Sequence, residues 1–278
     1  MGIAEEYVDL RLQRLQEEDL QRKPNKWLAA LPQCARARRV LDIACGLGYD
    51  SLAWVRAGKE VIGIDLNYEL LRNASRLAES QKLKVRFVVS RATSFPFADD
   101  SFDICYAENI FEHVPDWEKI VKEAHRVLAP GGVFFIVTTN RLCPINHEIN
   151  HMHFYPLLPE WLKRPILNWV VKHKPAWVNY SRFPAVNWFT YRGLARSLQD
   201  AGFDALEVFD VVDVELLSAR ARKFGFLLRL LREHPALRYL LYPLLVATQV
   251  FGIKRPAEAG PLPQVANEQS ALTGAPPA

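Results

Sequence analysis

The chain has 278 residues, half of them hydrophobic, with a formal net charge of +4 at neutral pH. That length can bury a sizeable core in one large domain or two small ones, and the charge is too small to predict a nucleic-acid partner. Four scattered cysteines without a CxxC pair exclude a zinc ribbon and indicate reduced thiols.

Residues 1–34 form the first expected unit, an N-terminal helical segment. They are rich in strong helix formers with periodic leucines, interrupted by Pro24 and Pro32. The segment contains no apolar signal core, so we expect a cytoplasmic protein.

From residue 35 to residue 140, short apolar runs alternate with amphipathic stretches. Strands are expected at 38–45, 59–65, 85–90, 101–109 and 133–139, and helices at 51–58, 68–82 and 116–128. Apolar strands separated by helices are typical of a doubly wound parallel sheet that is covered on both faces. We therefore expect an α/β core with a Rossmann-like arrangement.

Residues 141–188 break this alternation. They contain six prolines, four of the seven tryptophans and four of the seven histidines, without a clean period. A long aromatic insertion of this kind is usually functional, and we expect it to cover a substrate. An equally compatible interpretation is a plain core lid.

Residues 189–256 are expected to complete the sheet, with a helix at 190–203, a strand at 204–214 and amphipathic helices beyond. The stretch 222–253 mixes leucines and aromatic residues with Arg222, Lys223, Arg229, Arg232 and Arg238. It could rest on an anionic membrane surface, or it could pack in a homodimer or in the core. The proline-rich tail, 257–278, is expected to be disordered.

The most informative motif is VLDIACGLGYD at residues 40–50, where an apolar run ends in an acid and a loop with two glycines. A dinucleotide-binding loop would require a third glycine at the position of Ser51. Asp42 suits a ligand with a positive charge better than a pyrophosphate. Asp65 ends the next strand, where it could accept hydrogen bonds from ribose hydroxyls, although both acids could instead cap the following helices.

These residues resemble the class I S-adenosylmethionine-dependent methyltransferases. VLDIACGLG is similar to their first motif, VIGIDLN to their second, and residues 94–140 to the rest of their core. The resemblance covers residues 35–140 and 189–215. It implies a Rossmann-like sheet of seven strands, in which part of 244–256 is the last, antiparallel strand.

The resemblance also implies the cofactor, S-adenosyl-L-methionine, and the residues that contact it. These are Asp42, Ala44, Gly46, Gly48, Asp65, Leu66, Ala92, Thr93 and Glu108.

Each of these residues has an implied role in the family. The two glycines lie beside the methionine and ribose, Asp65 binds the ribose hydroxyls, and Leu66 packs near the adenine. Asp42 and Glu108 lie toward the methionine amino group, while Ala92 and Thr93 flank the adenine. One departure is Arg91, which stands where the family commonly has an aspartate that contacts the adenine amino group.

Histidines are the candidates for acid–base chemistry. A hydroxyl nucleophile must lose its proton, and a histidine that titrates near neutral pH is the usual acceptor. His113 follows the fourth strand, and His151 and His153 lie in the insertion. Hydrogen bonding within loops is the alternative role of each. His147 and His151 could ligate a metal from one helical face, but we predict no metal because no patterned carboxylate accompanies them.

The sequence thus predicts methyl transfer to a hydroxyl oxygen of a small or lipid-linked molecule, such as a phenol, a quinone ring, a sugar or a specialised metabolite. The alternatives are an NAD(P)-dependent oxidoreductase and a non-catalytic protein that binds S-adenosylmethionine. We expect no nucleic-acid partner, and peripheral membrane contact and a homodimer both stay open.

Overall fold

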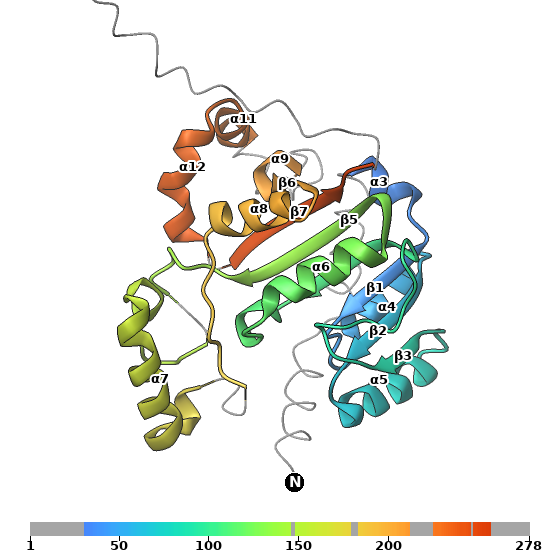
Figure 1. The fold of residues 1–278 in the computed structure, drawn as a ribbon, viewed down its shortest axis with the longest axis horizontal. Coiled ribbons are helices and arrows are strands. Elements are labelled where there is room, and N and C mark those ends of the chain that lie inside the picture. Colours follow the sequence, from blue (N-terminus) through green and yellow to red (C-terminus); the bar gives the residue numbers. More distant parts are fainter. Residues whose placement is uncertain (1–30, 146–147, 179–182, 212–224, 246, 257–278) are drawn as a thin grey trace, which may run out of the picture.

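A computed structural model of the protein describes residues 31–145, 148–178, 183–211, 225–245 and 247–256. Its centre is a seven-stranded sheet with the strand order β3-β2-β1-β4-β5-β7-β6 (Figure 1). The strands are β1 Arg39–Ile43, β2 Glu60–Asp65, β3 Arg86–Val89, β4 Phe102–Glu108, β5 Leu128–Thr139, β6 Phe203–Glu207 and β7 Ala247–Lys254. Strands β1 to β5 pair in parallel, and β7 runs antiparallel between β5 and β6. The expected Rossmann-like α/β fold is confirmed.

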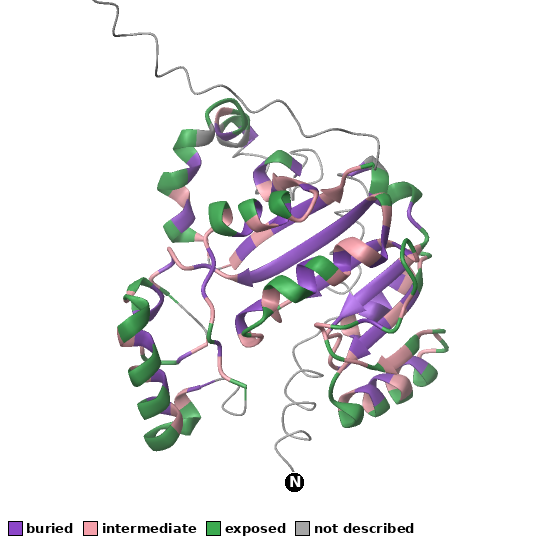
Figure 2. Ribbon diagram, viewed as in Figure 1, coloured by how far each residue is buried: buried purple, intermediate pink, exposed green. Residues whose placement is uncertain are grey.

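Helices cover both faces of this sheet because side chains alternate between the two faces along each strand. Leu41 and Cys105 point to the face covered by α6 (Trp117–Val127) and α8 (Tyr191–Asp200). Val40 and Tyr106 point to the face that packs against Trp54 of α4 (Tyr49–Arg56) and Cys34 of α3 (Pro32–Arg36). The central strands β1, β4 and β5 are mostly buried in Figure 2, β3 at the edge of the sheet is half-buried or exposed, and the helices bury one side only. Helix α5 (Tyr68–Ser80) follows β2.

Two strand boundaries differ from the expectation. Strand β5 begins at Leu128, five positions before the predicted start, because the pairing with β4 shifts register between Phe102 and Ile104 and admits the PGG turn. The strand expected at 204–214 ends at Glu207, and α9 (Val208–Val211) follows it. The Asp210 carboxylate accepts the Glu207 backbone N–H at 3.1 Å, which turns the chain into this helix. Residues 212–214 lie outside the described part.

The insertion 141–188 folds against its own small core rather than along the sheet. It contains η2 (Tyr155–Leu157), α7 (Glu160–His173) and η3 (Pro175–Trp177). Their cluster of buried side chains consists of Ile149, Tyr155, Leu167, Val170, Val178, Ala185 and Trp188. Helix α7 stands apart from the sheet in Figure 1, beyond the end at which β5 finishes. The insertion is therefore a separate layer over that end.

The C-terminal part is tied into the fold by buried ion pairs. After α11 (Gly225–Glu233), α12 (Pro235–Leu241) and η4 (Tyr242–Leu244) lead to β7. Arg238 is buried and pairs with Glu207 at 2.6 Å and with Asp210 at 2.5 Å. For the stretch 222–253 we left open a membrane surface, a homodimer or packing in the core. Within that stretch, Arg238 and strand β7 lie inside the fold.

Among the described residues, no helix has both the length and the apolar character needed to cross a membrane. The predictions for residues 1–30, for His147, for Arg222 and Lys223, and for the tail 257–278 concern residues that the structure does not describe.

Candidate active site

The glycine loop connects β1 to α4 and adopts left-handed backbone angles at Ala44, Gly46 and Gly48, with φ of 57°, 54° and 74°. A β-carbon added to Gly48 would lie 2.7 Å from Cζ of Phe87, so that position requires glycine for space as well as for its backbone angle. A β-carbon on Gly46 would meet nothing within 4 Å. The loop is thus packed against β3 at Gly48 and open in front of Gly46.

Asp42 explains why the loop has no third glycine. Its side chain is buried, and Oδ2 accepts a hydrogen bond of 2.5 Å from the hydroxyl of Ser51 in the first turn of α4. The serine therefore ties α4 to the end of β1. Asp42 does not cap α4, whose N-cap residue is Gly48. Being buried, it supports the loop from beneath.

Asp65 connects the glycine loop to the start of α5. One carboxylate oxygen accepts the Gly46 backbone N–H at 3.0 Å, and the other accepts that of Asn67 at 2.8 Å. Asn67, not Asp65, is the N-cap of α5. Each carboxylate oxygen keeps a second lone pair for a further donor. Leu66, beside it, is 59% exposed, so its side chain is free to contact the adenine that the family resemblance places there.

The surroundings of the loop are acidic. Burial raises the pKa of Asp42 well above its usual range, and the charges of Asp50, Glu108 and Asp65 raise it further. Glu108, at the end of β4, is half-buried and accepts a hydrogen bond from the hydroxyl of Tyr106. A pyrophosphate would be repelled by this set of carboxylates, whereas an ammonium or sulfonium group would be attracted. The residues therefore fit a cationic methionine group and oppose the dinucleotide alternative.

The segment expected beside the adenine follows β3. Ala92 packs against the main core, and Thr93 is half-buried. Arg91 is exposed, and its backbone forms an isolated bridge with Ser94. Where the family commonly has an aspartate, this chain therefore has a cation that is exposed to solvent.

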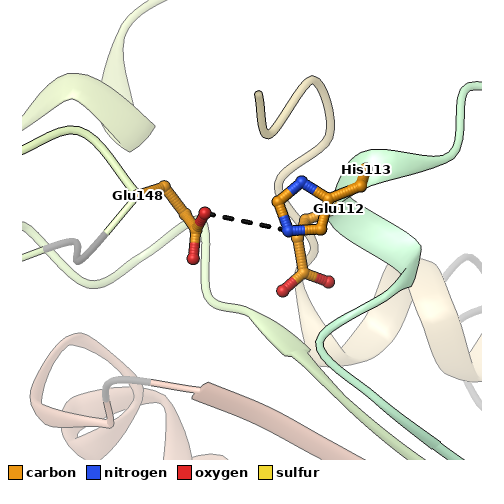
Figure 3. A group of neighbouring side chains, drawn as sticks. All are labelled: Glu112, His113 and Glu148. Carbon is orange, nitrogen blue, oxygen red and sulfur yellow. Dashed lines mark ion pairs between the residues drawn. The ribbon is translucent and has the colours of Figure 1, made fainter. Parts of the chain in front are cut away.

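A second cluster of side chains joins the loop after β4 to the insertion (Figure 3). Glu112 and His113 belong to η1 (Phe111–His113), and Glu148 comes from the insertion. One ligand atom of each residue lies within 4.8 Å of the others. His113 Nε2 is 3.9 Å from Glu148 Oε2, which is too far for a hydrogen bond. All three side chains point toward one another.

Glu112 is held rigidly at the bottom of this cluster. Its Oε2 accepts a hydrogen bond of 2.9 Å from Thr138 of β5, and its backbone carbonyl accepts the N–H groups of Val186 and Asn187. Burial raises the pKa of Glu112 to about 8, and the charge of Glu148 contributes to the rise. Glu112 is therefore largely protonated at neutral pH.

The chemistry available to the cluster follows from these environments. Burial lowers the pKa of His113, so its imidazole is neutral at pH 7 and able to accept a proton. Burial raises the pKa of Glu148, whose Oε2 lacks a hydrogen-bond partner within the described residues. Two carboxyl groups and an imidazole are suited to proton transfer, and the same donor types can also bind a divalent cation.

The sequence prediction identified only one member of this cluster. His113 joins it, but His151 and His153 are exposed, and the ring of His151 packs against Trp177 at 5.4 Å. Glu112 and Glu148 were not predicted. The sequence did contain one signal for Glu148. It is a carboxylate between His147 and His151, in the segment where we saw no carboxylate to accompany the histidines.

Comparison with known proteins supports a methyltransferase core. A family model described as a methyltransferase domain matches residues 41–136. An uncharacterised methyltransferase of Mycobacterium sp. (strain JLS) is 35% identical over 129 residues, which are 46% of this chain and 50% of the relative. A chloroplastic tocopherol O-methyltransferase of Arabidopsis thaliana is 41% identical over 106 residues, 37% of this chain and 30% of the relative.

The fold comparison extends further along the chain. The crystal structure of the YcgJ protein from Bacillus subtilis aligns with 82% of this chain and 98% of its own, at a TM-score of 0.53 and 22% identity. That similarity shows the fold. At the level of sequence, the chain spans about half the length of the first curated relatives that it matches, so their similarity concerns the core domain.

Proposed function

Because residues 41–136 belong to the class I S-adenosylmethionine-dependent methyltransferase family, we propose that the protein transfers a methyl group to a hydroxyl oxygen of a small or lipid-linked molecule. The cofactor is S-adenosyl-L-methionine, which supplies a methyl group bound to a positively charged sulfur. The acidic surroundings of the glycine loop, with Asp65 and Glu108, support this assignment, because carboxylates attract a positively charged group.

The observation that carries the proposal is the position of the Glu112–His113–Glu148 cluster. In open α/β sheets, ligands bind beyond the carboxyl ends of the strands. Glu108 ends β4, and η1 follows it within three residues, while Thr138 of β5 holds Glu112. The cluster therefore lies at the same edge of the sheet as the acids of the cofactor loop.

Methyl transfer places few chemical demands on the protein. It must align the acceptor oxygen with the methyl carbon and the sulfur, and it must exclude water. An alcohol or phenol must also lose its proton as the new bond forms. His113 is neutral at working pH and takes this proton, while Glu148 stabilises the imidazolium that results.

Glu112 orients this pair. The Thr138 hydroxyl donates a hydrogen bond to its carboxyl group. The backbone carbonyl of Glu112 accepts the N–H groups of residues 186 and 187. Since it is protonated at neutral pH, it can donate a hydrogen bond to an acceptor oxygen or to Glu148.

The similarity to a tocopherol O-methyltransferase supports an oxygen as the acceptor atom, although it covers only 37% of this chain. The insertion that supplies Glu148 is rich in aromatic side chains, which suits an acceptor with a ring or an apolar body. A phenol, a hydroquinone, a sugar or a lipid-linked form of these meets this description.

The proposal is tested first by exchanging His113. We expect His113→Gln to lower kcat for a hydroxyl acceptor roughly 10²- to 10⁴-fold, with little change in the cofactor affinity measured by calorimetry. His153→Gln is the matched control, since that histidine is exposed and outside the cluster. Equal activity of the wild type and His113→Gln would refute the assigned base.

The non-catalytic alternative is tested with the wild-type protein alone. A cofactor-binding protein without activity would bind S-adenosylmethionine but form no S-adenosylhomocysteine with any acceptor in a panel of phenols, hydroquinones and sugars. We expect turnover with at least one hydroxyl acceptor and none with the matched amines.

A further inference from the structure

Helix α7 exposes two tryptophans on the side that faces away from its own core. Trp161 is 75% exposed and Trp169 is 52% exposed. Large aromatic side chains are normally buried, and two of them on one short surface helix require an explanation. In Figure 1 this helix stands at the periphery of the molecule, with the sheet on its other side.

The helical spacing sorts the side chains of α7 into two opposite faces. Lys163, Leu167 and Val170 are buried against the small core of the insertion. The exposed face consists of Trp161, Arg164, Pro165, Asn168, Trp169 and Lys172. Residues three, four, seven and eight positions apart share one side of a helix, so these tryptophans and cations form a single surface.

Two more apolar side chains are exposed shortly before the helix begins. Phe154 and Leu157 are exposed at 63% and 47%. Leu157 ends η2 and Phe154 is its N-cap residue, so both precede α7 in the chain. The turn is held by a hydrogen bond from the Phe154 backbone N–H to the carbonyl of Pro144 at 2.7 Å. The loop therefore presents these side chains in a fixed position.

The charge of the same surface is positive. Arg164 and Lys172 lie among the tryptophans, and Lys174 follows the end of the helix. The acid on this helix, Glu160, is paired with Lys163 at 2.8 Å and with Arg141 at 3.4 Å. Its negative charge is therefore neutralised from within the fold, and the exposed cations dominate.

From these features we propose that the exposed face of α7, extended by Phe154 and Leu157, binds the surface of an anionic phospholipid bilayer. Tryptophan favours the boundary between headgroups and acyl chains because its ring is apolar and its N–H is polar. Arginine and lysine between the tryptophans attract anionic headgroups. Helices that lie in an interface have this composition.

A protein partner is less compatible with this surface than a bilayer. The tryptophans are separated by Pro165 and Asn168 and interspersed with cations, which would place charges inside a protein interface. A bilayer instead solvates each cation with phosphate and each ring with lipid. Three other exposed apolar residues lie on different elements and serve as a comparison: Phe226 of α11, Leu240 of α12 and Leu244 of η4.

Binding of α7 to a bilayer would also orient the candidate active site, an inference that rests on the proposed function. Glu148 belongs to the same insertion as α7, so docking of α7 holds the cluster near the membrane surface. An acceptor anchored in the bilayer could then place its hydroxyl group beside His113 without leaving the lipid. The acceptor class favoured here is therefore a lipid-linked hydroxyl compound.

The test is co-sedimentation of the full chain with vesicles, without cofactor or acceptor. We expect binding to phosphatidylcholine vesicles that contain one third phosphatidylglycerol, weak binding to pure phosphatidylcholine, and loss of binding at high salt. Brominated lipids should quench the tryptophan fluorescence of the bound wild type. Trp161→Ala with Trp169→Ala, and separately Arg164→Gln with Lys172→Gln, should each weaken partitioning roughly tenfold or more.

Two matched variants serve as controls. Arg76→Gln with Lys84→Gln removes two exposed cations elsewhere, and Phe226→Ala with Leu240→Ala removes exposed apolar side chains of α11 and α12. Neither should change partitioning. The proposal is overturned if the wild type does not bind anionic vesicles, if only the α11–α12 variant loses binding, or if the α7 variants merely dissociate a dimer.

Methyl transfer to a soluble hydroxyl acceptor is measured separately, so the two proposals can fail independently. Vesicle binding without any methyl transfer would refute the proposed function and leave the membrane surface intact. Methyl transfer without vesicle binding would refute the membrane surface and leave the proposed function intact.

Discussion

The two glycines of the glycine loop differ in how much space a side chain would have. Gly46 and Gly48 both adopt left-handed backbone angles, but only Gly48 is pressed against Phe87. Replacement of a glycine by alanine in this conformation costs about 1–2 kcal/mol. Forcing a methyl group against the Phe87 ring adds about 1–3 kcal/mol.

We therefore predict that Gly48→Ala destabilises the fold clearly more than Gly46→Ala, as measured by urea unfolding. Gly46→Ala should instead act mainly on the cofactor, because its β-carbon would enter the open space in front of the loop. Calorimetric titration with S-adenosylhomocysteine should show weaker binding at modest cost in stability. Equal stability of the two variants would contradict the packing described at Gly48.

Glu112 makes stability depend on pH in a defined window. Its pKa is 4.5 in an unfolded chain and about 8 in the fold, because burial disfavours the charged carboxylate. Between these values the folded protein holds more protons, so this contribution to stability is complete below pH 4.5 and is lost as the pH rises to 8. The slope is at most about 1.4 kcal/mol for each pH unit.

In Glu112→Gln this dependence should disappear. The unfolding free energy of the wild type minus that of the variant should fall from pH 5 to pH 8 and stay constant above it. Glu60→Gln is the control, because that carboxylate is 68% exposed and pairs only at the surface. Parallel curves for wild type and Glu112→Gln would show that Glu112 is ionised in the fold.

The same protonation bears on the metal question. A neutral Glu112 leaves little negative charge in the cluster, so we expect activity to be unchanged after dialysis against a chelator. Loss of activity that manganese or magnesium restores would instead identify the Glu112–His113–Glu148 cluster as a metal site.

At the scale of elements, α12 depends on one buried cation. Arg238 pairs with Glu207 of β6 and Asp210 of α9, and the Tyr242 hydroxyl donates a hydrogen bond to Glu207. Removing one partner of a buried pair leaves a buried charge without compensation, at about 3–5 kcal/mol. Arg238→Ala should lower the unfolding free energy by that amount and expose α12 to proteolysis.

The contrast is the surface pair of Arg38 and Glu60, whose side chains are 79% and 68% exposed. Such pairs contribute about 1 kcal/mol or less, so Arg38→Ala should change stability little. If Arg38→Ala and Arg238→Ala were equally mild, the Arg238 pairing would not anchor the C-terminal helices.

The elements differ in how well their sequence predicts them. The strands and helices of the core were predictable because each apolar run is ended by a turn or an acid, as in β1 and β2. Helix α7 was not, because Lys163 occupies the buried face of the helix and Pro165 interrupts its pattern. Lys163 can be buried since it pairs with Glu160 and lies 5.0 Å from the ring of Trp188. The pair with Glu160 is local, but the contact with Trp188 is not visible in the local sequence.

Across the whole molecule, the glycine loop was easier to predict from the sequence than the Glu112–His113–Glu148 cluster. The loop is local, and its glycines and acids lie within 26 residues, from 40 to 65. The Glu112–His113–Glu148 cluster instead joins residues that are separated in the sequence by α6, β5 and the segment that follows β5. That contact depends on how the insertion folds back over the sheet, and a local pattern does not encode it. The sequence alone therefore predicted one of the three cluster residues, and its assignment of Asp42, Asp65 and Glu108 to the cofactor stays a prediction.

We propose that the protein methylates an oxygen atom at the cluster of His113, Glu112 and Glu148. The most direct measurement uses cofactor with a carbon-13-labelled methyl group and a panel of phenols, hydroquinones, sugars, their lipid-linked forms and matched amines. We predict that the labelled carbon appears in an O-methyl group by NMR, with wild-type protein but not with His113→Gln. A labelled carbon on nitrogen or carbon, or equal labelling by His113→Gln, would contradict the account.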